Sequence, residues 1–543
     1  MALNTAAIES ELATLENKVE DMKSLETSLV TQLDNLRSSL KKHKNRMAQL
    51  HNLRMPINSL PNEILIEIFK SGPSTPWNSL DYVMNISQVI RRWRAAAIST
   101  PSLWAFVHVG FLSWSKWLRL MEVFLERSGS HALDIVVHFD RNCPKRRSQP
   151  HNPLKDLREL HERLLFVVNR LRRVIIVGNK PEDVFLILPP FRLLCAPLLE
   201  ILEVKAQEEE FRWDTPDPLL IFEGGAPKLN RLKVEGISLS SCQPPKSSIV
   251  SLHLGPHENT SLSEIETAVA GANNLTDLHL LGRIQIDSVG VPEFKIPSIR
   301  SLSVSIDPAP PFDDLIYFLC GLQAPNLEKL IVHCTFLSRR KPDFNLFSGD
   351  YQHPRLLSLT LHCSATIRSW EAACFITMFP SITHLTLEVD TYGSFERLLL
   401  ALLPDDPDPD PEECEEQQKS GSLAWPRLHI ITLAAIPPED ERDLDALYDV
   451  ISSRISRGAP IGCIQIPSLE YIPAETLKWL QERVTVEEFS VWEMDCEDVE
   501  DYGKSGQYFE IPGSYANPYH PYSSDDPQYR DYSEEPSSTP SSR

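Results

Sequence analysis

The chain has 543 residues, of which 42% are hydrophobic, and a formal net charge of -22. A single core does not keep growing to this length, so the sequence predicts a multidomain protein with enough apolar residues to form a real core. The acidic balance disfavours nucleic-acid binding, which requires clustered positive charge. No apolar run approaches the ~20 residues of a membrane span, and the first residues do not read as a secretory signal. We therefore expect an intracellular protein, cytoplasmic and/or nuclear, with no nucleic-acid or membrane partner.

Residues 1–53 are predicted to form one long helix with a coiled-coil seam. From residue 8 to residue 50 an apolar residue recurs at alternating steps of four and three, and only Glu26 and His43 interrupt the seam. Pro56 must end the helix. We expect self-association through residues 8–50; the alternative is a single amphipathic helix that packs on its own protein. The apolar seam residues are Ile8, Leu12, Leu15, Val19, Met22, Leu29, Leu33, Leu36, Leu40, Met47 and Leu50.

Two short apolar helices are predicted next, within "INSLPNEILIEIFKSG" (57–72) and "ISQVIRRWRAAAISTPSLW" (86–104). In the first, Pro61 stands in the first turn and four large apolar residues follow on one face. The second carries a stripe that ends at Trp93. A unit this small cannot hide so many large side chains, so either the downstream region or another protein must cover them.

Segment 56–104 resembles an F-box, in three blocks whose matching residues are Leu60, Pro61, Glu63, Ile64, Leu65, Ile68 and Phe69, then Val89, Arg92 and Trp93, then residues 101–104. It departs from the family at Ile90, where Cys is common, and in a longer segment between the first two blocks. The resemblance implies a small all-α unit that docks the Skp-type subunit of a cullin-type (SCF) ubiquitin ligase. The residues it implies for that contact are Leu60, Pro61, Ile64, Leu65, Ile68, Phe69, Val89 and Trp93. Leu65 and Trp93 are expected to project toward the partner.

Residues 105–170 are predicted to form a helix–strand linker, and residues 171–492 a repeat region. One pattern recurs there at intervals of 20 to 30 residues up to Ile382: apolar, two variable residues, apolar, one variable residue, apolar. Seven units have Pro two positions before the first apolar residue, where it ends a helix without costing a ladder hydrogen bond. The units begin at Leu171, Leu199, Leu229, Ile249, Leu275, Ile299, Leu327, Leu356, Ile382 and Leu428, with a further candidate at Val486.

The repeat region indicates alternating strands and helices, with a parallel sheet curved into a solenoid. It resembles leucine-rich repeats as a class, with a period typical of them but without their asparagine ladder. A doubly wound α/β domain remains the alternative. Residues 404–422 and the acidic tail 493–543 are predicted to be disordered, because neither can bury a core. The fold class we expect is multidomain and mainly α/β: an N-terminal coiled coil, an all-α F-box unit and an irregular leucine-rich-repeat α/β solenoid.

Catalytic motifs are absent from the sequence. There is no GxSxG, GxxxxGK[ST], HExxH or GxGxxG, and no Cys/His cluster at zinc spacing. We therefore expect no enzyme, no cofactor and no metal. Two functions stay open. One is a substrate-recognition adaptor whose solenoid binds an unknown target protein, in an order of parts that resembles the expanded F-box families of mushroom-forming fungi. The other is a structural scaffold that uses coil and solenoid without ligase docking.

Overall fold

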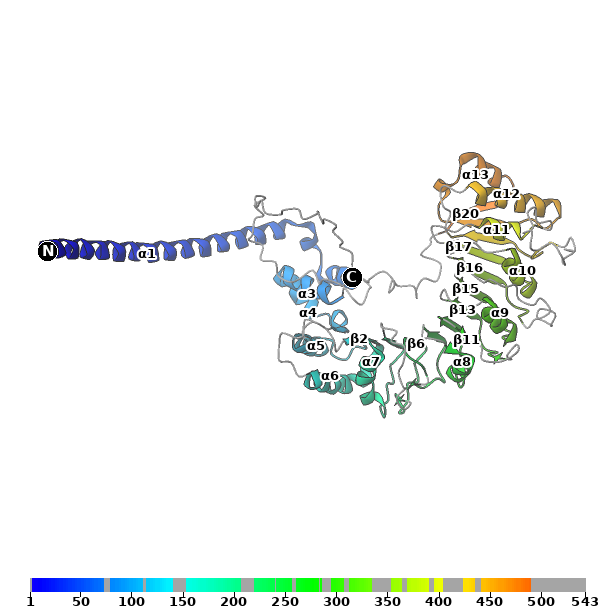
Figure 1. Ribbon diagram of the computed structural model, residues 1–543, viewed down its shortest axis with the longest axis horizontal. Helices are drawn as coiled ribbons and strands as arrows, with labels where there is room; N and C mark the ends of the chain where they lie inside the picture. The colour runs from blue at the N-terminus through cyan, green and yellow to red at the C-terminus, as the bar shows by residue number, and fades with distance from the viewer. Residues whose placement is uncertain are drawn as a thin grey trace, which may run out of the picture. The chain divides into compact units, whose positions relative to one another are not determined.

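The computed structural model describes residues 2–72, 79–110, 114–139, 153–206, 219–239, 241–255, 260–282, 284–285, 294–306, 312–334, 353–363, 369–389, 395–403, 423–434 and 441–489. The predicted acidic insertion 404–422 and tail 493–543 lie outside these residues. Within them the chain is a mixed helical and sheet protein (Figure 1). None of its described helices is both long and apolar enough to cross a membrane.

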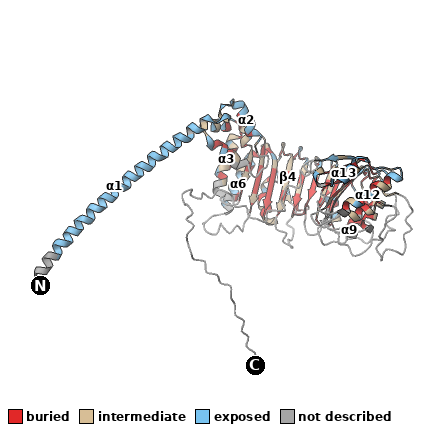
Figure 2. Ribbon diagram, turned by 90° about the horizontal axis from the view of Figure 1, so that it is seen from above, coloured by how far each residue is buried: buried red, intermediate tan, exposed pale blue. Residues whose placement is uncertain are grey.

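The long N-terminal helix predicted from the seam is present as α1 (Ala2–Arg54). It ends at Arg54, and a 3-10 turn (Pro56–Ser59) follows Met55 because proline cannot continue the helix. From residue 8 to residue 48 every side chain of α1 is exposed, as the colouring of Figure 2 shows. The helix therefore contributes nothing from its seam to the core of its own chain.

One parallel sheet holds fourteen strands of the described chain, and each strand pairs with the next of them in sequence. The order never reverses, whereas a doubly wound sheet has a switch point where it does. The strands are β1 (Phe106–Val109), β2 (Leu133–Phe139), β3 (Leu171–Gly178), β4 (Ile201–Ala206), β6 (Arg231–Glu235), β8 (Ser251–Leu254), β10 (Asp277–Leu281), β13 (Ser301–Ile306), β15 (Lys329–Cys334), β16 (Ser358–Cys363), β17 (His384–Val389), β18 (Ile430–Leu433), β19 (Cys463–Ile466) and β20 (Thr485–Glu488).

Register follows the apolar repeat across the sheet. Leu202 pairs with Leu232, which pairs with Leu252, and the alignment continues unit by unit. Because side chains alternate between the two faces of a strand, one face of every unit is apolar and enters a continuous core. Short parallel pairs lie beside the main sheet: β5 (Leu219–Leu220) with β7 (Cys242–Gln243), β9 (Thr260–Ser261) with β11 (Ile284–Gln285), and β12 (Phe294–Lys295) with β14 (Leu322–Gln323).

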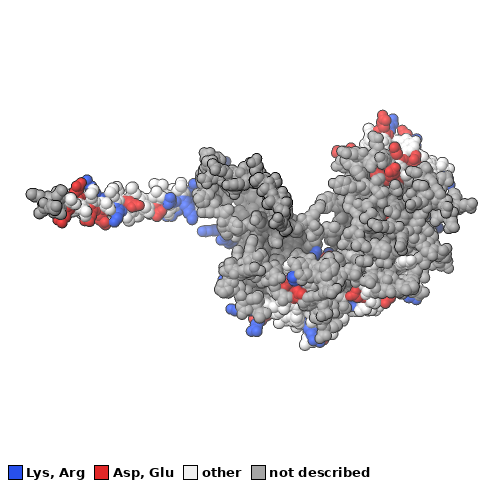
Figure 3. All heavy atoms as spheres, viewed as in Figure 1, with Lys and Arg blue, Asp and Glu red and all other residues white. Residues whose placement is uncertain are grey.

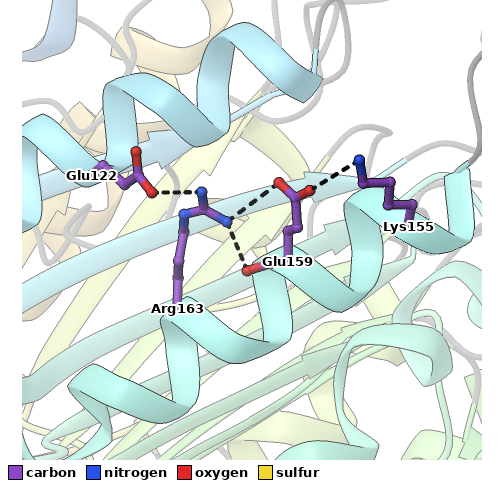
Figure 4. A network of polar contacts seen from close by, with 4 residues as sticks. All are labelled: Glu122, Lys155, Glu159 and Arg163. Carbon is purple, nitrogen blue, oxygen red and sulfur yellow. Dashed lines mark hydrogen bonds and ion pairs between the residues drawn. The ribbon is translucent and has the colours of Figure 1, made fainter.

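Helices between the strands cover this apolar face of the sheet (Figure 1). The helices are α5 (Trp114–Arg127), α6 (Pro153–Val167), α7 (Pro181–Ile187), α8 (Leu262–Val269), α9 (Phe312–Gly321), α10 (Ser369–Met378), α11 (Glu396–Leu400), α12 (Glu441–Ser456) and α13 (Ala474–Gln481). Arg163 on α6 links α5 to α6, since its guanidinium lies 2.8 Å from Glu122 on α5 and 3.6 Å from Glu159 on its own helix (Figure 4).

Helix α12 holds the chain on both sides of residues 404–422. Asp443 accepts a hydrogen bond of 2.8 Å from the backbone N–H of Glu396, at the start of α11. Arg454 is fully buried and donates to the carbonyl oxygens of Ala424 and Trp425, each at 2.9 Å. Burial lowers the pKa of Arg454 to about 10, so the guanidinium stays charged at neutral pH. The two flanks are thus tied to one helix.

The sheet extends beyond the predicted repeat region at its N-terminal end. Strands β1 and β2 precede Leu171 and pair in the same ladder, so residues 105–170 contribute two strands and two helices rather than a separate linker. Trp104, Val107 and Val109 repeat the pattern of apolar, two residues, apolar, one residue, apolar. A further unit that the sequence analysis did not identify, Ile461/Ile464/Ile466, forms β19.

Candidate docking site and target face

Three short helices, α2 (Asn62–Lys70), α3 (Ser79–Val89) and α4 (Arg91–Ile98), form the unit between α1 and the sheet. They enclose a small core of their own. Its buried members are Leu65, Phe69, Ile86, Ala96 and Ala97. The two alanines of α4 leave room for α2 and α3 to approach closely. The unit therefore does not need the sheet to bury these side chains.

Arg92 and Trp93 fix the chain that leads into α2. Arg92 donates to Asn62 Oδ1 at 2.8 Å, to the carbonyl oxygen of Asn58 at 2.6 Å and to that of Leu60. Trp93 donates from Nε1 to Asn58 Oδ1 at 3.0 Å, and its ring packs edge-on against Phe69 with centroids 5.2 Å apart. The Arg–Trp pair thus holds residues 58–62 in place.

Helix α2 divides its large apolar residues between the inside and the surface. Leu65 and Phe69 are 0% and 2% exposed, while Ile64 and Ile68, one helical turn apart, are 48% and 39% exposed. The expectation that Leu65 projects outward is corrected by this burial, because α3 and α4 cover its side of the helix. Of the other predicted contact residues, Pro61 and Val89 are exposed, and Leu60 and Trp93 are half-buried.

Trp104 joins this unit to the sheet. It closes the 3-10 turn Pro101–Trp104 and donates from Nε1 to the carbonyl oxygen of Ala97 at 2.8 Å. Its ring is 0% exposed and meets Phe124 of α5 edge-on at 4.9 Å, with the guanidinium of Arg127 4.3 Å from its centroid. The residue belongs to the core of the sheet and carries the C-terminal end of α4 with it.

The face of the sheet opposite the helices is polar over most of its strands. At its N-terminal end this face is apolar and buried, at Val136, Ile175 and Val177. Next to that cluster it carries ion pairs, including Arg173 with Glu203 at 2.6 Å and Lys205 with Glu235 at 2.9 Å. Farther along, histidines of neighbouring strands stack: His253 on His279 at 3.8 Å and His333 on His362 at 4.1 Å. We call this surface the open face.

Burial controls the charge of several groups on the open face. It lowers the pKa of His253 to about 2, with help from the neighbouring His279, and that of His333 to about 4. Burial alone would raise the pKa of Glu235, but the charges of Lys233 and Lys205 more than offset it, so the net shift is downward. His253 and His333 are therefore neutral at physiological pH, and His253 and Glu235 are themselves buried, at 2% and 7% exposed.

Among the described residues, no group of three or more His, Cys, Asp and Glu side chains is placed to hold a metal ion. The geometry of the short helices and of the open face suits protein contacts: apolar stripes, hydroxyls, imidazoles and paired charges.

Comparison with known families and structures bears on the helical unit. Residues 57–109 match the family model described as F-box-like. The chain carries an F-box-like domain. No curated protein matches the chain. A solved structure of a Bacteroides fragilis protein, determined as a structural genomics target, matches with 15% identity over 61% of this chain and 69% of that one, at a TM-score of 0.24. That score is too low to assign a common fold.

The F-box-like domain and the sheet share a strand. The match ends at residue 109, and β1 ends at Val109. The strand at the end of the F-box-like domain, β1, is therefore also the first strand of the sheet. Sequence reasoning placed the end of the domain at Trp104 and did not identify β1, although the spacing Trp104/Val107/Val109 was the available signal.

Proposed function

We propose that the chain is a substrate-recognition adaptor of a cullin-type ubiquitin ligase, without catalysis of its own, in the cytoplasm and/or nucleus. The F-box-like domain at residues 57–109 is the observation that carries the proposal. It would dock the Skp-type subunit, while the repeat region would bind a target protein for ubiquitin transfer.

The exposed half of α2 forms the centre of the proposed docking surface. Ile64 and Ile68 stand next to each other on a helix whose other apolar residues already fill a core, so their exposure costs free energy that a partner would recover. Pro61 and Val89 extend the contact. Leu65, Phe69, Trp93 and Leu60 support the surface from beneath and from its rim, rather than projecting from it.

The repeat region acts in this proposal as an irregular leucine-rich-repeat-like solenoid. Support comes from the fourteen parallel strands in chain order and from the aligned apolar positions of its units. The target would lie on the open face, where consecutive strands present their side chains side by side. The neutral imidazoles of His253 and His333 and the hydroxyl groups of this face favour a hydrogen-bonded contact over one driven by net charge.

Co-expression with a Skp-type subunit tests the docking step. The double variant Ile64→Asp/Ile68→Asp should weaken capture of the subunit by roughly 30-fold or more, because each change places a charge in an apolar contact. The melting temperature should stay unchanged, since both side chains are exposed. Phe166→Asp is the matched control: Phe166 is 87% exposed but lies on α6, outside the F-box-like domain.

The scaffold function is the competing hypothesis, and capture of the subunit separates the two. If the wild-type chain does not retain a Skp-type subunit, the adaptor proposal is wrong and the F-box-like domain serves to cap the sheet. If capture occurs but the Asp variant captures equally well, the adaptor role stands and α2 is not its docking surface.

A further inference from the structure

Helix α1 presents an uncovered apolar seam. Ile8, Leu15, Leu29 and Leu36 are 55%, 55%, 55% and 70% exposed, and the other apolar seam residues lie between 45% and 61%. An apolar stripe repeated every 3.5 residues over about six heptads pairs most efficiently with another such stripe. The described residues of this chain hold no second helix of comparable length.

The charges of α1 are distributed unevenly along its length. Residues 8–26 hold six acids and two bases, whereas residues 27–54 hold one acid and six bases. Figure 3 shows acidic side chains gathered toward the N-terminal end of the helix and basic ones toward the other end. Each half therefore attracts the opposite half of another copy and repels the same half.

The positions that flank the seam carry part of this asymmetry. In a parallel pair, the flank on one side of the seam meets the other flank five residues farther along the second helix. That rule brings Glu11 to Glu16 and Lys18 to Lys23 of the second copy, so like charges meet. In an antiparallel pair each flank meets itself in reverse. The acidic flank residues Glu9, Glu11 and Glu16 then run beside the basic end that holds Arg37, Lys44 and Arg46.

We propose that two copies of this chain associate through α1 as an antiparallel coiled coil, with the seam of residues 8–50 buried between them. Glu26 and His43, which interrupt the seam, each face an apolar residue rather than their own copy, so no layer pairs two like polar residues. This assembly does not depend on ligase docking. It places two F-box-like domains at opposite ends of the coil, roughly 70–80 Å apart at 1.5 Å per residue.

The oligomeric state comes first. Light scattering of the full chain should give the mass of a dimer at micromolar concentration. Leu29→Glu/Leu33→Glu should convert it to a monomer, because both changes bury charge in the seam. Ser28→Glu/Asn35→Glu adds the same charge on the outer side of the helix and should leave the dimer intact. A monomeric wild-type chain overturns the proposal, and so does a dimer that survives the seam variant.

Charge reversal then decides the orientation. One variant makes the first half basic (Glu9→Lys, Glu11→Lys, Glu16→Lys), a second makes the other half acidic (Arg37→Glu, Lys44→Glu, Arg46→Glu), and a third combines both. Each single set should weaken the dimer about tenfold or more at low salt, and the combined variant should restore wild-type affinity. A parallel coil keeps like charges together in the combined variant, so absence of restoration overturns the antiparallel orientation.

Energy transfer between labelled N-termini gives an independent measure. With donor and acceptor on the α-amino groups of the two copies, an antiparallel coil separates the labels by about 80 Å. Transfer should then be weak, and it should stay weak at both low and high salt. Strong transfer within a dimer of the correct mass would place the N-termini together and overturn the orientation.

Discussion

Leu65 and Ile64 are adjacent residues with opposite roles. Leu65→Ala should cost about 2–5 kcal/mol of folding stability within the F-box-like domain, because it leaves a cavity among Phe69, Ile86 and Ala97. Ile64→Ala should change stability by less than about 0.5 kcal/mol and weaken capture of the Skp-type subunit instead. Thermal melts and pull-downs of both variants separate the two effects. A destabilised Ile64→Ala variant would place that side chain in the core, contrary to the structure.

His253 should make the sheet sensitive to acid. Its pKa is about 2 in the folded chain and about 6.5 when exposed, so between these values only the unfolded state takes up the proton. Its contribution to stability is complete above pH 6.5 and is lost as the pH falls below it, at about 1 kcal/mol per pH unit. The stability difference between pH 7 and pH 5 should shrink in His253→Gln. The matched change at the exposed His131 should leave it as in the wild type.

Arg454 supports buried backbone rather than a charge partner. Arg454→Met should lower stability by about 3 kcal/mol or more, because the carbonyl oxygens of Ala424 and Trp425 lose their donor inside the core. Arg119→Met, on an exposed part of α5, is the control for loss of a guanidinium. Unfolding followed by calorimetry compares them. Equal melting temperatures for the two variants would contradict a structural role for Arg454.

At the scale of the elements, Trp104 couples the F-box-like domain to the sheet. Trp104→Ala should lower the melting temperature of the sheet and also reduce capture of the Skp-type subunit, since the residue packs on α5 and holds the end of α4. Trp479→Ala removes a ring that packs against Tyr448 near the other end of the sheet, and it should affect stability alone. Measuring both properties on both variants tests the coupling.

The apolar repeat gave a reliable prediction of the strands, because burial on one face of a parallel sheet requires it at every unit. It located ten of the strands. The further candidate at Val486 falls in β20, but Val486 pairs with Ile464, the second apolar residue of its unit, so the pattern was placed three residues too late. It did not identify β19, although Ile461, Ile464 and Ile466 have the spacing of the repeat. It did not identify β1 either, because Trp104 had been assigned to the F-box resemblance. Spacing alone could not show that Trp104 fits both the F-box pattern and the apolar repeat.

The candidate site was only partly predictable for a different reason. The apolar arc of α2 is wide, and sequence periodicity groups Ile64, Leu65, Ile68 and Phe69 on one side. Which half of that arc faces the chain's own core depends on where α3 and α4 pack, and a helical period carries no information about that. Hence the residues were identified as a set, while the division into buried and exposed members came from the structure.

For the whole molecule, α1 should be separable from the rest. Its side chains from residue 8 to residue 48 are exposed, so a chain that starts at Met55 should retain the melting temperature of the sheet and the capture of the Skp-type subunit. Only the dimer should be lost. A lower melting temperature in the shortened chain would show that α1 packs on its own protein, which is the alternative stated for its seam.

Because β1 belongs to both the F-box-like domain and the sheet, a fragment that lacks the rest of that domain should not be stable. A proteolytic fragment that began after Trp104 would retain the open face, but it would lose the buried ring beneath the first strand and leave an apolar end of the sheet uncovered. Such a fragment would aggregate or be degraded, and could not persist as a free competitor that binds the target without delivering it. Under the adaptor proposal, recognition and delivery would therefore be gained or lost together.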